Sequence, residues 1–384
     1  MNTKIYPEQK VHTALVIPII AALTLCSPFV SAGTTFKQIN LVTDNQSVNS
    51  ANITDANLQN AWGLSYNPTG PFWISDNGTG LSTVYSVNPA TNVTAKVPLT
   101  VTIPGDGTVT GQFYNNNAAA FNGDPFIFVS EDGTISGWRG ALGTTAETLK
   151  NASAANVYKG ATEAAVGNNS YLYAANFRAD SIDVIPGTTA APSLSGNFTD
   201  PNLPAGYAPF NIQNLGGNLY VTYAIQDASK HDEVAGLGNG LVDEFDTQGH
   251  LLGRIASQGT LNAPWGLAIA PTSFGQYAGD LLVGNFGDGK INAFNQVTHG
   301  FDGQLIGSNG QLLSIDGLWA LETGNNGSAG SSQILYFTAG PNGEVNGLFG
   351  SVNAVPLPSA LWLFSSALFG FGFFGKRRKA KLSC

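Results

Sequence analysis

Oxygen-bearing side chains recur at the ends of short hydrophobic segments along this 384-residue chain. Asp76, Glu131, Asn176 and Asn285 each end such a segment, and Asp316 stands in a turn that enters another. Carboxylate and amide oxygens are the ligands that hard cations such as Ca²⁺ prefer. If the segments are strands arranged around one axis, these side chains converge at one end of the ring. The sequence therefore predicts a candidate metal or ligand face, with Ca²⁺ as its possible cofactor.

The alternative is a local explanation of the same residues. Asp and Asn are common in β-turns because their side chains bond the neighbouring backbone and tolerate left-handed geometry. The equivalent positions in the fourth and sixth segments are Tyr223 and Ala339, so a ring of ligands would not be symmetric. Turn formation alone accounts for residues of this kind.

A second candidate lies in the connection formed by residues 226–240. It contains His231 and Asp232, followed by Glu233, within a Gly-rich stretch. A long connection without regular structure is often functional, and His beside carboxylates can ligate a divalent metal or move a proton. The alternative is a charged loop that is simply solvated.

These residues are placed by a repeat of hydrophobic segments. Positions 76, 131, 176, 223, 285 and 339 align at spacings of 45 to 62 residues. Alternating apolar segments and turn sequences such as Asp246-Thr247-Gln248-Gly249 flank each marker, which is the pattern of strands joined by hairpins. A period near fifty is typical of a propeller blade. We predict an all-β, six-bladed β-propeller with four-stranded blades over residues 33–353.

Two further features complete the prediction for the ring. Residues 36–41 are expected to pair with the last blade near residues 348–352, because an unpaired sheet edge invites aggregation. Trp62, Trp265 and Trp319 begin strands at equivalent places, which favours a role in packing between blades over stacking against a carbohydrate.

The N-terminus has the features of a signal peptide. Lys4 and Lys10 precede an apolar segment, and the small residues before Gly33 suit signal peptidase, so residues 1–32 are expected to be removed by cleavage after Ala32.

The C-terminus, residues 354–384, has three parts in order. A short Pro motif is followed by an apolar stretch of about 18 residues, which is long enough for a transmembrane helix, and then by a basic cluster. These features are carried by Val355, Pro356, Leu357, Pro358, Lys376, Arg377, Arg378 and Lys379. The segment resembles the PEP-CTERM sorting signal of Gram-negative bacteria, although Leu357 stands where that family has Glu. The resemblance implies processing by an exosortase and release to the cell surface or biofilm matrix after transient anchoring in the inner membrane. An ordinary anchor that is never cut is the alternative.

Several motifs within the repeat resemble an uncharacterised bacterial extracellular propeller family that often carries such a tail. They are EDGTISGW at 131–138, AANFR at 174–178, AGYAPFNI at 205–212, VGNFGDG at 283–289 and FTAGPNG at 337–343. More distantly, the blades resemble NHL-repeat proteins, lactonases and calcium-dependent phosphotriesterases. The resemblance implies the fold and export but no catalytic mechanism.

Composition narrows the possible partners. Residues 33–355 contain 9 Lys and Arg against 24 Asp and Glu, a net charge of −15, which argues against a nucleic-acid ligand. Cys26 and Cys384 both lie outside this region, so a disulfide or a thiolate site within the propeller is excluded. The motifs of a Ser-hydrolase elbow and of a phosphate-binding loop are absent.

Two functions therefore remain for the propeller. One is a non-catalytic surface or matrix module that binds a polysaccharide or a protein. The other is a divalent-metal-dependent hydrolase of lactonase or phosphoesterase type, with its site on the propeller face. The catalytic residues of such an enzyme are not identified by the sequence.

Overall fold

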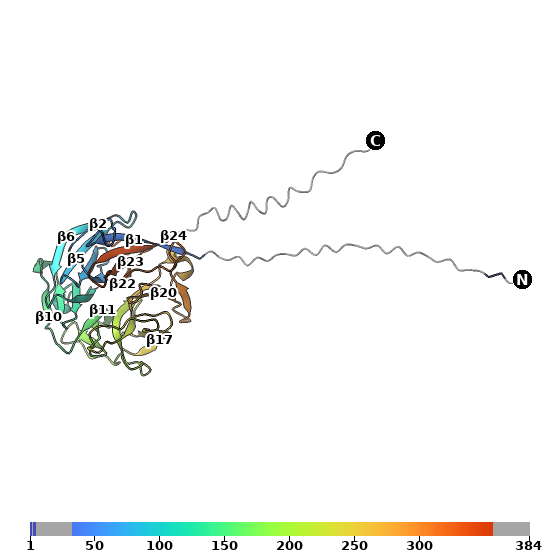
Figure 1. Cartoon of the computed structure of the whole chain (residues 1–384). Coiled ribbons are helices and arrows are strands. Elements are labelled where there is room, and N and C mark those ends of the chain that lie inside the picture. Colours follow the sequence, from blue (N-terminus) through green and yellow to red (C-terminus); the bar gives the residue numbers. More distant parts are fainter. Residues whose placement is uncertain (2, 5–32, 356–384) are drawn as a thin grey trace. The chain divides into compact units, whose positions relative to one another are not determined.

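Six β-sheets are arranged around a central axis in the computed structural model of the chain, which describes residues 1, 3, 4 and 33–355 (Figure 1). The predicted six-bladed propeller is confirmed. The first blade consists of β3 (Ala61–Ser65), β4 (Phe72–Asp76), β5 (Leu81–Val87) and β6 (Thr94–Thr102). The second blade consists of β7 (Val109–Tyr114), β8 (Phe126–Ser130), β9 (Ile135–Trp138) and β10 (Glu147–Lys150). The third blade consists of β11 (Tyr158–Val166), β12 (Asn169–Asn176) and β13 (Ser181–Pro186).

The other three blades complete the ring. The fourth blade consists of β14 (Tyr207–Leu215), β15 (Asn218–Ile225), β16 (Leu241–Phe245) and β17 (Leu251–Ser257). The fifth blade consists of β18 (Pro264–Ile269), β19 (Leu281–Asn285), β20 (Ile291–Phe294) and β21 (Phe301–Gln304). The sixth blade consists of β22 (Leu318–Thr323), β23 (Leu335–Ala339), β24 (Leu348–Val355), β1 (Thr35–Thr43) and β2 (Ile53–Thr54). Short 3₁₀ turns occur at η1 (Phe121–Gly123), η2 (Gly140–Leu142) and η3 (Thr272–Tyr277).

The third blade corrects the expectation of four strands in every blade. After β13 the chain continues through residues 187–206 without another strand, and this stretch contains Pro192, Pro201 and Pro204. Proline has no backbone N–H to donate to a sheet ladder, which weakens pairing with β13 but does not forbid it, since the outer strand β6 contains Pro98. The segment instead bonds to a turn of the fourth blade, where the Phe198 N–H donates to the Gly249 carbonyl at 3.0 Å.

The ring closes through its two ends, as predicted. β1 pairs antiparallel with β24, and Ile39 lies opposite Ser351. The last blade is thus built from both ends of the propeller, which leaves β24 with a partner on each side. Val355, assigned by sequence to the sorting motif, pairs with Thr35 as the last residue of β24.

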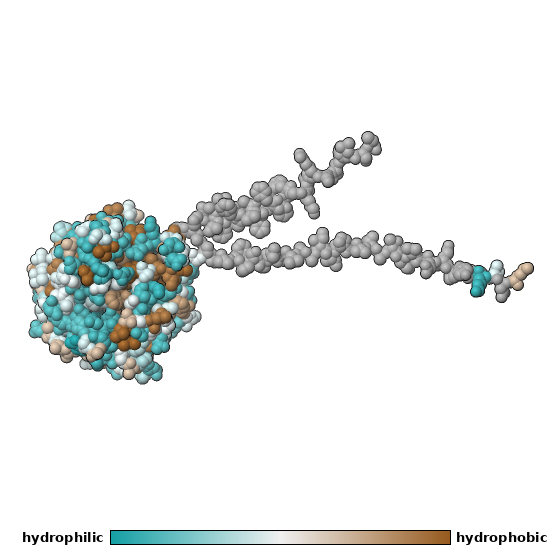
Figure 2. Space-filling model, in the orientation of Figure 1, coloured by the Kyte–Doolittle hydropathy of each residue, from teal (hydrophilic) through white to brown (hydrophobic). Residues whose placement is uncertain are grey.

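The first strand of each blade lies nearest the axis. β3, β7, β11, β14, β18 and β22 contact one another in sequence, and β22 contacts β3. Apolar residues from adjoining blades pack between the sheets, and Figure 2 shows hydrophilic residues over much of the visible face with hydrophobic residues in smaller groups. These six innermost strands therefore surround the axis of the propeller.

The predicted N-terminal signal and the C-terminal apolar and basic segments fall in residues 5–32 and 356–384, outside the described residues. Among residues 1, 3, 4 and 33–355, no helix is long and apolar enough to cross a membrane.

Candidate functional site

A cavity of about 340 Å³ lies where the innermost strands begin. Six of the residues that line it are ionisable, and His231 is one of them. The other five come from four different blades, and we call this group the acidic mouth: Glu131, Lys159, Asp232, Glu233 and Glu344. Glu131 directly follows β8, Lys159 lies in β11, and Glu344 lies between β23 and β24. Blade geometry thus brings together residues that are far apart in the sequence.

Lys159 is the cation of the acidic mouth. Its side chain is only 1% exposed, and its ammonium forms ion pairs with Glu131 and, at 3.3 Å, with Asp232. The same nitrogen lies 5.2 Å from the centre of the Trp62 ring, a cation–π distance. Burial lowers the pKa of Lys159, but Glu131 and Glu233 outweigh that effect and raise it overall. The lysine is therefore an ammonium ion and not a free amine nucleophile.

Glu131 and Glu344 are tied together by two asparagines. Asn77 donates to Glu131 Oε2 at 3.2 Å, and Asn60 donates both to Asn77 Oδ1 at 3.1 Å and to Glu344 Oε2 at 2.8 Å. The Trp319 indole N–H donates to Asn60 Oδ1 at 2.9 Å, which fixes the orientation of that amide. This chain of bonds holds the carboxylates of the second and sixth blades around one space.

Glu344 adopts a backbone conformation that L-residues rarely take. Its φ is 68°, and its N–H donates to the Gly340 carbonyl at 3.0 Å. Left-handed geometry at a non-glycine residue costs about 1–3 kcal/mol and persists where surrounding contacts fix it. Here the bond from Asn60 to the side chain is one of those contacts.

The loop after β15 supplies His231 and Asp232. Asp227 organises it: its Oδ1 accepts the His231 N–H at 2.9 Å, and its own N–H donates to the Asp232 carbonyl at 2.8 Å. His231 Nδ1 lies 2.8 Å from Asp232 Oδ1. Burial raises the pKa of Asp232, but Lys159 and His231 outweigh it, and the pKa is lowered overall. The loop is thus a compact turn that places the partly exposed carboxylate of Asp232 beside Lys159.

The remaining carboxylates are held at higher pKa values. Burial raises the pKa of Glu233 to about 7 in spite of Lys159, which acts in the opposite direction. Burial also raises the pKa of Glu344. Glu233 is therefore protonated in part of the molecules near pH 7, and a cation brought close to it would favour its ionised form.

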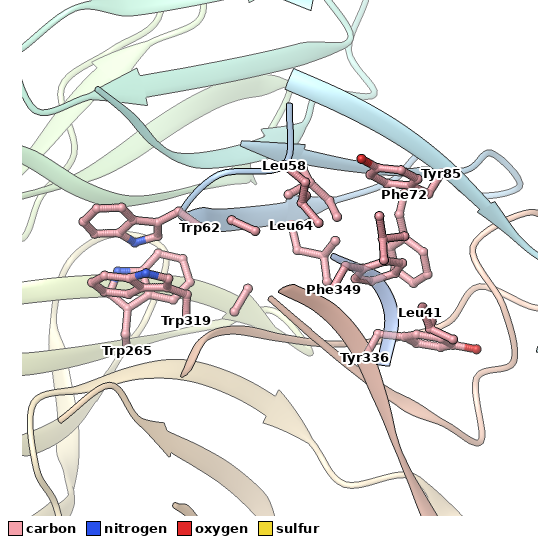
Figure 3. Close-up of a cluster of buried hydrophobic side chains, with 14 of the residues drawn as sticks. Leu41, Leu58, Trp62, Leu64, Phe72, Tyr85, Trp265, Trp319, Tyr336 and Phe349 are labelled. Carbon is pink, nitrogen blue, oxygen red and sulfur yellow. The ribbon is translucent and has the colours of Figure 1, made fainter. Parts of the chain in front are cut away.

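Aromatic rings pack beside the acidic mouth, and Figure 3 shows the rings of Trp62, Trp265 and Trp319 close together. Trp62 and Trp319 stack with ring centres 3.7 Å apart, and Trp265 meets Trp319 edge-on at 5.9 Å. Phe286 stacks on Trp319 at 4.0 Å. The expectation that these tryptophans pack between blades is confirmed, because each is at most 4% exposed, although Trp62 and Trp319 also line the cavity.

Three of the predicted site residues come together. Glu131, His231 and Asp232 each offer a ligand atom within 4.8 Å of the others, a separation that could hold a metal ion. Lys159 already pairs with Glu131 and Asp232. A metal ion in this group would therefore have to replace or lie beside an ammonium.

Asn176 and Asn285 are used within their own blades instead. Asn176 donates to Asp183 Oδ2 at 3.1 Å and accepts the Val157 N–H, while Asn285 accepts the Asn262 N–H at 3.1 Å. These are the local turn interactions that the sequence left open as the alternative to metal binding.

Asp76 and Asp316 also lie apart from the acidic mouth. Asp76 is fully buried at the end of β4, and burial raises its pKa well above the ordinary value. Asp316 accepts the Asn342 N–H at 2.8 Å on the surface. Neither residue lines the cavity that contains Glu131.

Sequence reasoning did not single out Lys159 or Glu344. One signal was present: Lys159 is one of only nine basic residues in 33–355 and stands in a strand of apolar and small residues. Glu344 gave no comparable signal, because it lies in a turn between two strands.

Comparison with curated proteins finds relatives in a virus. The chain is 30% identical over 342 residues to the uncharacterized protein R648 of Acanthamoeba polyphaga mimivirus, covering 84% of this chain and 81% of that protein. This chain belongs to the same family as protein R648. A second protein of the same virus, the uncharacterized protein L690, is similar to part of the chain, with 33% identity over 205 residues, which is 51% of each chain.

Solved structures share the fold of this family at low identity. The GH93 α-L-arabinofuranosidase of Fusarium graminearum, in complex with arabinobiose, matches with a TM-score of 0.51 and 10% identity over 83% of this chain and 98% of the enzyme. A streptogramin B lyase matches with a TM-score of 0.45 and 11% identity over 84% and 98% of the two chains. No protein-family model matches the sequence. The likeness extends to the propeller fold and not to a reaction.

Proposed function

We propose that the propeller is a non-catalytic binding module whose acidic mouth takes a basic side chain of a protein partner. The observation that carries the proposal is the charge balance of the cavity. Four carboxylates, those of Glu131, Asp232, Glu233 and Glu344, surround a single ammonium. An incoming cation would supply the missing positive charge.

The position of Lys159 favours binding over catalysis. Its ammonium lies between Glu131 and Asp232, the two carboxylates that a catalytic metal would need. Glu233 and Glu344 have no ion pair with Lys159, so they remain available to a ligand. A net charge of −15 on residues 33–355 would also attract a basic partner over a distance comparable to the screening length.

Calorimetry with a matched pair of peptides tests the proposal. An acetylated, amidated Gly-Arg-Gly peptide should bind, and the Gly-Gln-Gly peptide should not. Glu344→Gln should weaken binding of the arginine peptide by about tenfold, since a hydrogen bond to a charged group contributes roughly 1.5–3 kcal/mol. The control Asp302→Asn removes one charge from the outer strand β21 and should leave affinity within about twofold. Equal binding of both peptides would contradict the proposal.

A metal-dependent hydrolase is the second candidate, because Glu131, His231 and Asp232 are close enough to share an ion. This function predicts stoichiometric Ca²⁺ or another divalent ion and hydrolysis of a lactone or phosphoester that is lost on chelation. His231→Ala and Asp232→Asn should then abolish both metal binding and turnover. If calorimetry shows no divalent-ion binding by the wild-type protein, this candidate is excluded.

We also infer how the protein is exported and processed from the sequences of its N-terminal and C-terminal segments. Signal peptidase would remove residues 1–32, and an exosortase would process the Pro motif, leaving an acidic propeller at the surface or in the matrix of a Gram-negative cell. Mass spectrometry of protein secreted by such a host tests both steps. Recovery of extracellular protein that still contains Arg377 and Arg378 would exclude processing at the tail.

A further inference from the structure

A second cavity, of about 320 Å³, lies where the innermost strands end. The acidic mouth uses the start of β3, β11 and β22, whereas this cavity uses later residues of the same strands and of β7 and β14. We call it the distal cavity. The polar residues on which its chemistry depends are Ser65, Gln112, Glu163, Gln213 and Glu322.

Glu322 links three blades at this end of the ring. Tyr66 Oη donates to Glu322 Oε1 at 3.4 Å, and Gln213 Nε2 donates to Glu322 Oε2 at 3.2 Å. The Thr323 N–H donates to Oε1 at 3.1 Å. These donors fix the carboxyl group of Glu322 in the wall of the cavity.

Gln112 presents an oxygen that has no partner. Its Nε2 donates to the carbonyls of Gly63 at 2.8 Å and Trp73 at 2.7 Å, so both amide hydrogens are used and the orientation of the amide is fixed. The residue is 5% exposed, yet Oε1 has no hydrogen-bond partner. A buried acceptor without a donor is costly and calls for one from outside the chain.

Two further oxygens of the distal cavity are in the same state. Ser65 is 7% exposed and its Oγ has no partner, and Glu163 Oε1 is buried without one. Two amide groups of the lining are engaged, because Asn214 Nδ2 bonds the Glu163 carbonyl at 2.9 Å and Gln213 bonds Glu322. The Ser65 hydroxyl can donate as well as accept, whereas the free oxygens of Gln112 and Glu163 are acceptors that the chain does not fill.

The charges of the lining have one sign. Glu163 and Glu322 are its carboxylates, and none of its lining residues is Lys, Arg or His. The rings of Tyr66 and Tyr114 also line it, and aromatic faces favour an adjacent cation. A ligand that suits these walls is positively charged and carries N–H donors.

We propose that the distal cavity binds a small organic ammonium ligand, with its N–H groups donating to Gln112, Glu163 and Glu322. A neutral polyol would fill the open acceptors but would not compensate the carboxylates. A divalent metal fits less well, since the metal-capable group found among the described residues is at the acidic mouth and the distal cavity has only two carboxylates. This site is independent of the function proposed for the acidic mouth.

Calorimetry on the full chain with simple probes tests the site. Ethanolamine and 1,4-diaminobutane should bind to the wild-type protein. Glu163→Gln and Glu322→Gln should each weaken binding by at least about tenfold, the usual effect of removing a charged acceptor. Asp302→Asn, which removes a charge from an outer strand, should leave these affinities within about twofold. Circular dichroism and thermal midpoints establish whether each variant is folded. If Glu322→Gln does not fold, Glu163→Gln alone serves as the test.

Three comparison probes can overturn the proposal. Tetramethylammonium is a cation without N–H donors, erythritol is a neutral polyol, and CaCl₂ supplies a hard metal ion. Binding of any of these as tightly as ethanolamine shows that the cavity selects something other than an N–H cation. Absence of amine binding, or equal weakening by Asp302→Asn, overturns the assignment of an ammonium site to the distal cavity.

Discussion

Replacing Lys159 by methionine removes the only cation of the acidic mouth while keeping a side chain of similar length. The ammonium is 1% exposed and pairs with Glu131, whose side chain is 10% exposed, and with Asp232, which is 65% exposed. The Glu131 pair is therefore the buried one. We expect Lys159→Met to lower the free energy of unfolding at pH 7 by about 3 kcal/mol, within the usual 3–5 kcal/mol for removing one member of a buried ion pair.

That magnitude combines three contributions. Breaking the buried pair leaves Glu131 uncompensated near Glu344 and Glu233, which is the main cost. The contact with the exposed Asp232 adds at most about 1 kcal/mol. The methionine side chain packs against the Trp62 ring in place of the ammonium and returns part of the loss.

Urea unfolding followed by tryptophan fluorescence at pH 5, 7 and 8 measures the effect. The loss should shrink at pH 5, because the carboxylates can take up protons where the lysine charge is missing. A double variant, Lys159→Met with Glu131→Gln, removes both charges and should recover at least about 1 kcal/mol relative to Lys159→Met alone. Lys37→Met, at an exposed position of β1, is the matched control and should change stability by less than about 0.5 kcal/mol.

The reasoning fails if Lys159→Met differs from wild type by less than about 1 kcal/mol at pH 7, a value typical of surface pairs. It also fails if removing the Glu131 charge gives no recovery. Either result would mean that the ion pair does not determine the structure of the acidic mouth.

Two further predictions concern the distal cavity and the closure of the ring. Burial raises the pKa of Glu322 from its ordinary 4.5 to about 7, so the folded state binds the proton more tightly and stability falls as pH rises through this window. The Gln side chain of Glu322→Gln cannot ionise. The free energy of unfolding of this variant, measured by urea titration relative to wild type, should therefore increase by about 1–3 kcal/mol between pH 5 and pH 8. A difference between the two proteins that does not change with pH would contradict this sign. Deleting residues 33–43 removes β1 and exposes the edge of β24. We expect the cooperative thermal transition to be lost and light scattering to show association that increases with protein concentration. A monomer with an unchanged thermal midpoint would show that closure of the ring by β1 is dispensable.

Much of the fold was accessible from the sequence because each blade carries its own local pattern. The alternation of apolar residues and turn residues identified six repeats, and the pairing of residues 36–41 with the last blade followed from the need to cover an edge. The number of strands in two blades was not accessible in this way. The third blade has three strands, with residues 187–206 forming no outer strand, and the last blade has five because β1 and β2 join it.

The candidate site was only partly accessible for a geometric reason. Glu131, His231 and Asp232 were identified, because unusual side chains at strand ends and in a long loop are visible locally. Lys159, which pairs with Glu131 and Asp232, was not identified, since a single lysine in a strand does not show which way it faces or what it meets across the axis. Asn176 and Asn285 looked equivalent to Glu131 in the repeat, but each is satisfied by its own turn.

By itself, the sequence determined the repeat, the turn chemistry, the acidity of residues 33–355 and the expectation of export, because these depend on residues near one another or on composition. The tertiary structure decided which charges meet. It alone placed Lys159 among carboxylates from other blades and left Gln112 Oε1 without a donor at the other end of the ring. The physical reason is that the axis of a propeller collects one strand from every blade, so contacts there join residues of different blades, as the two ion pairs of Lys159 do at separations of 28 and 73 positions, and no local pattern relates such residues.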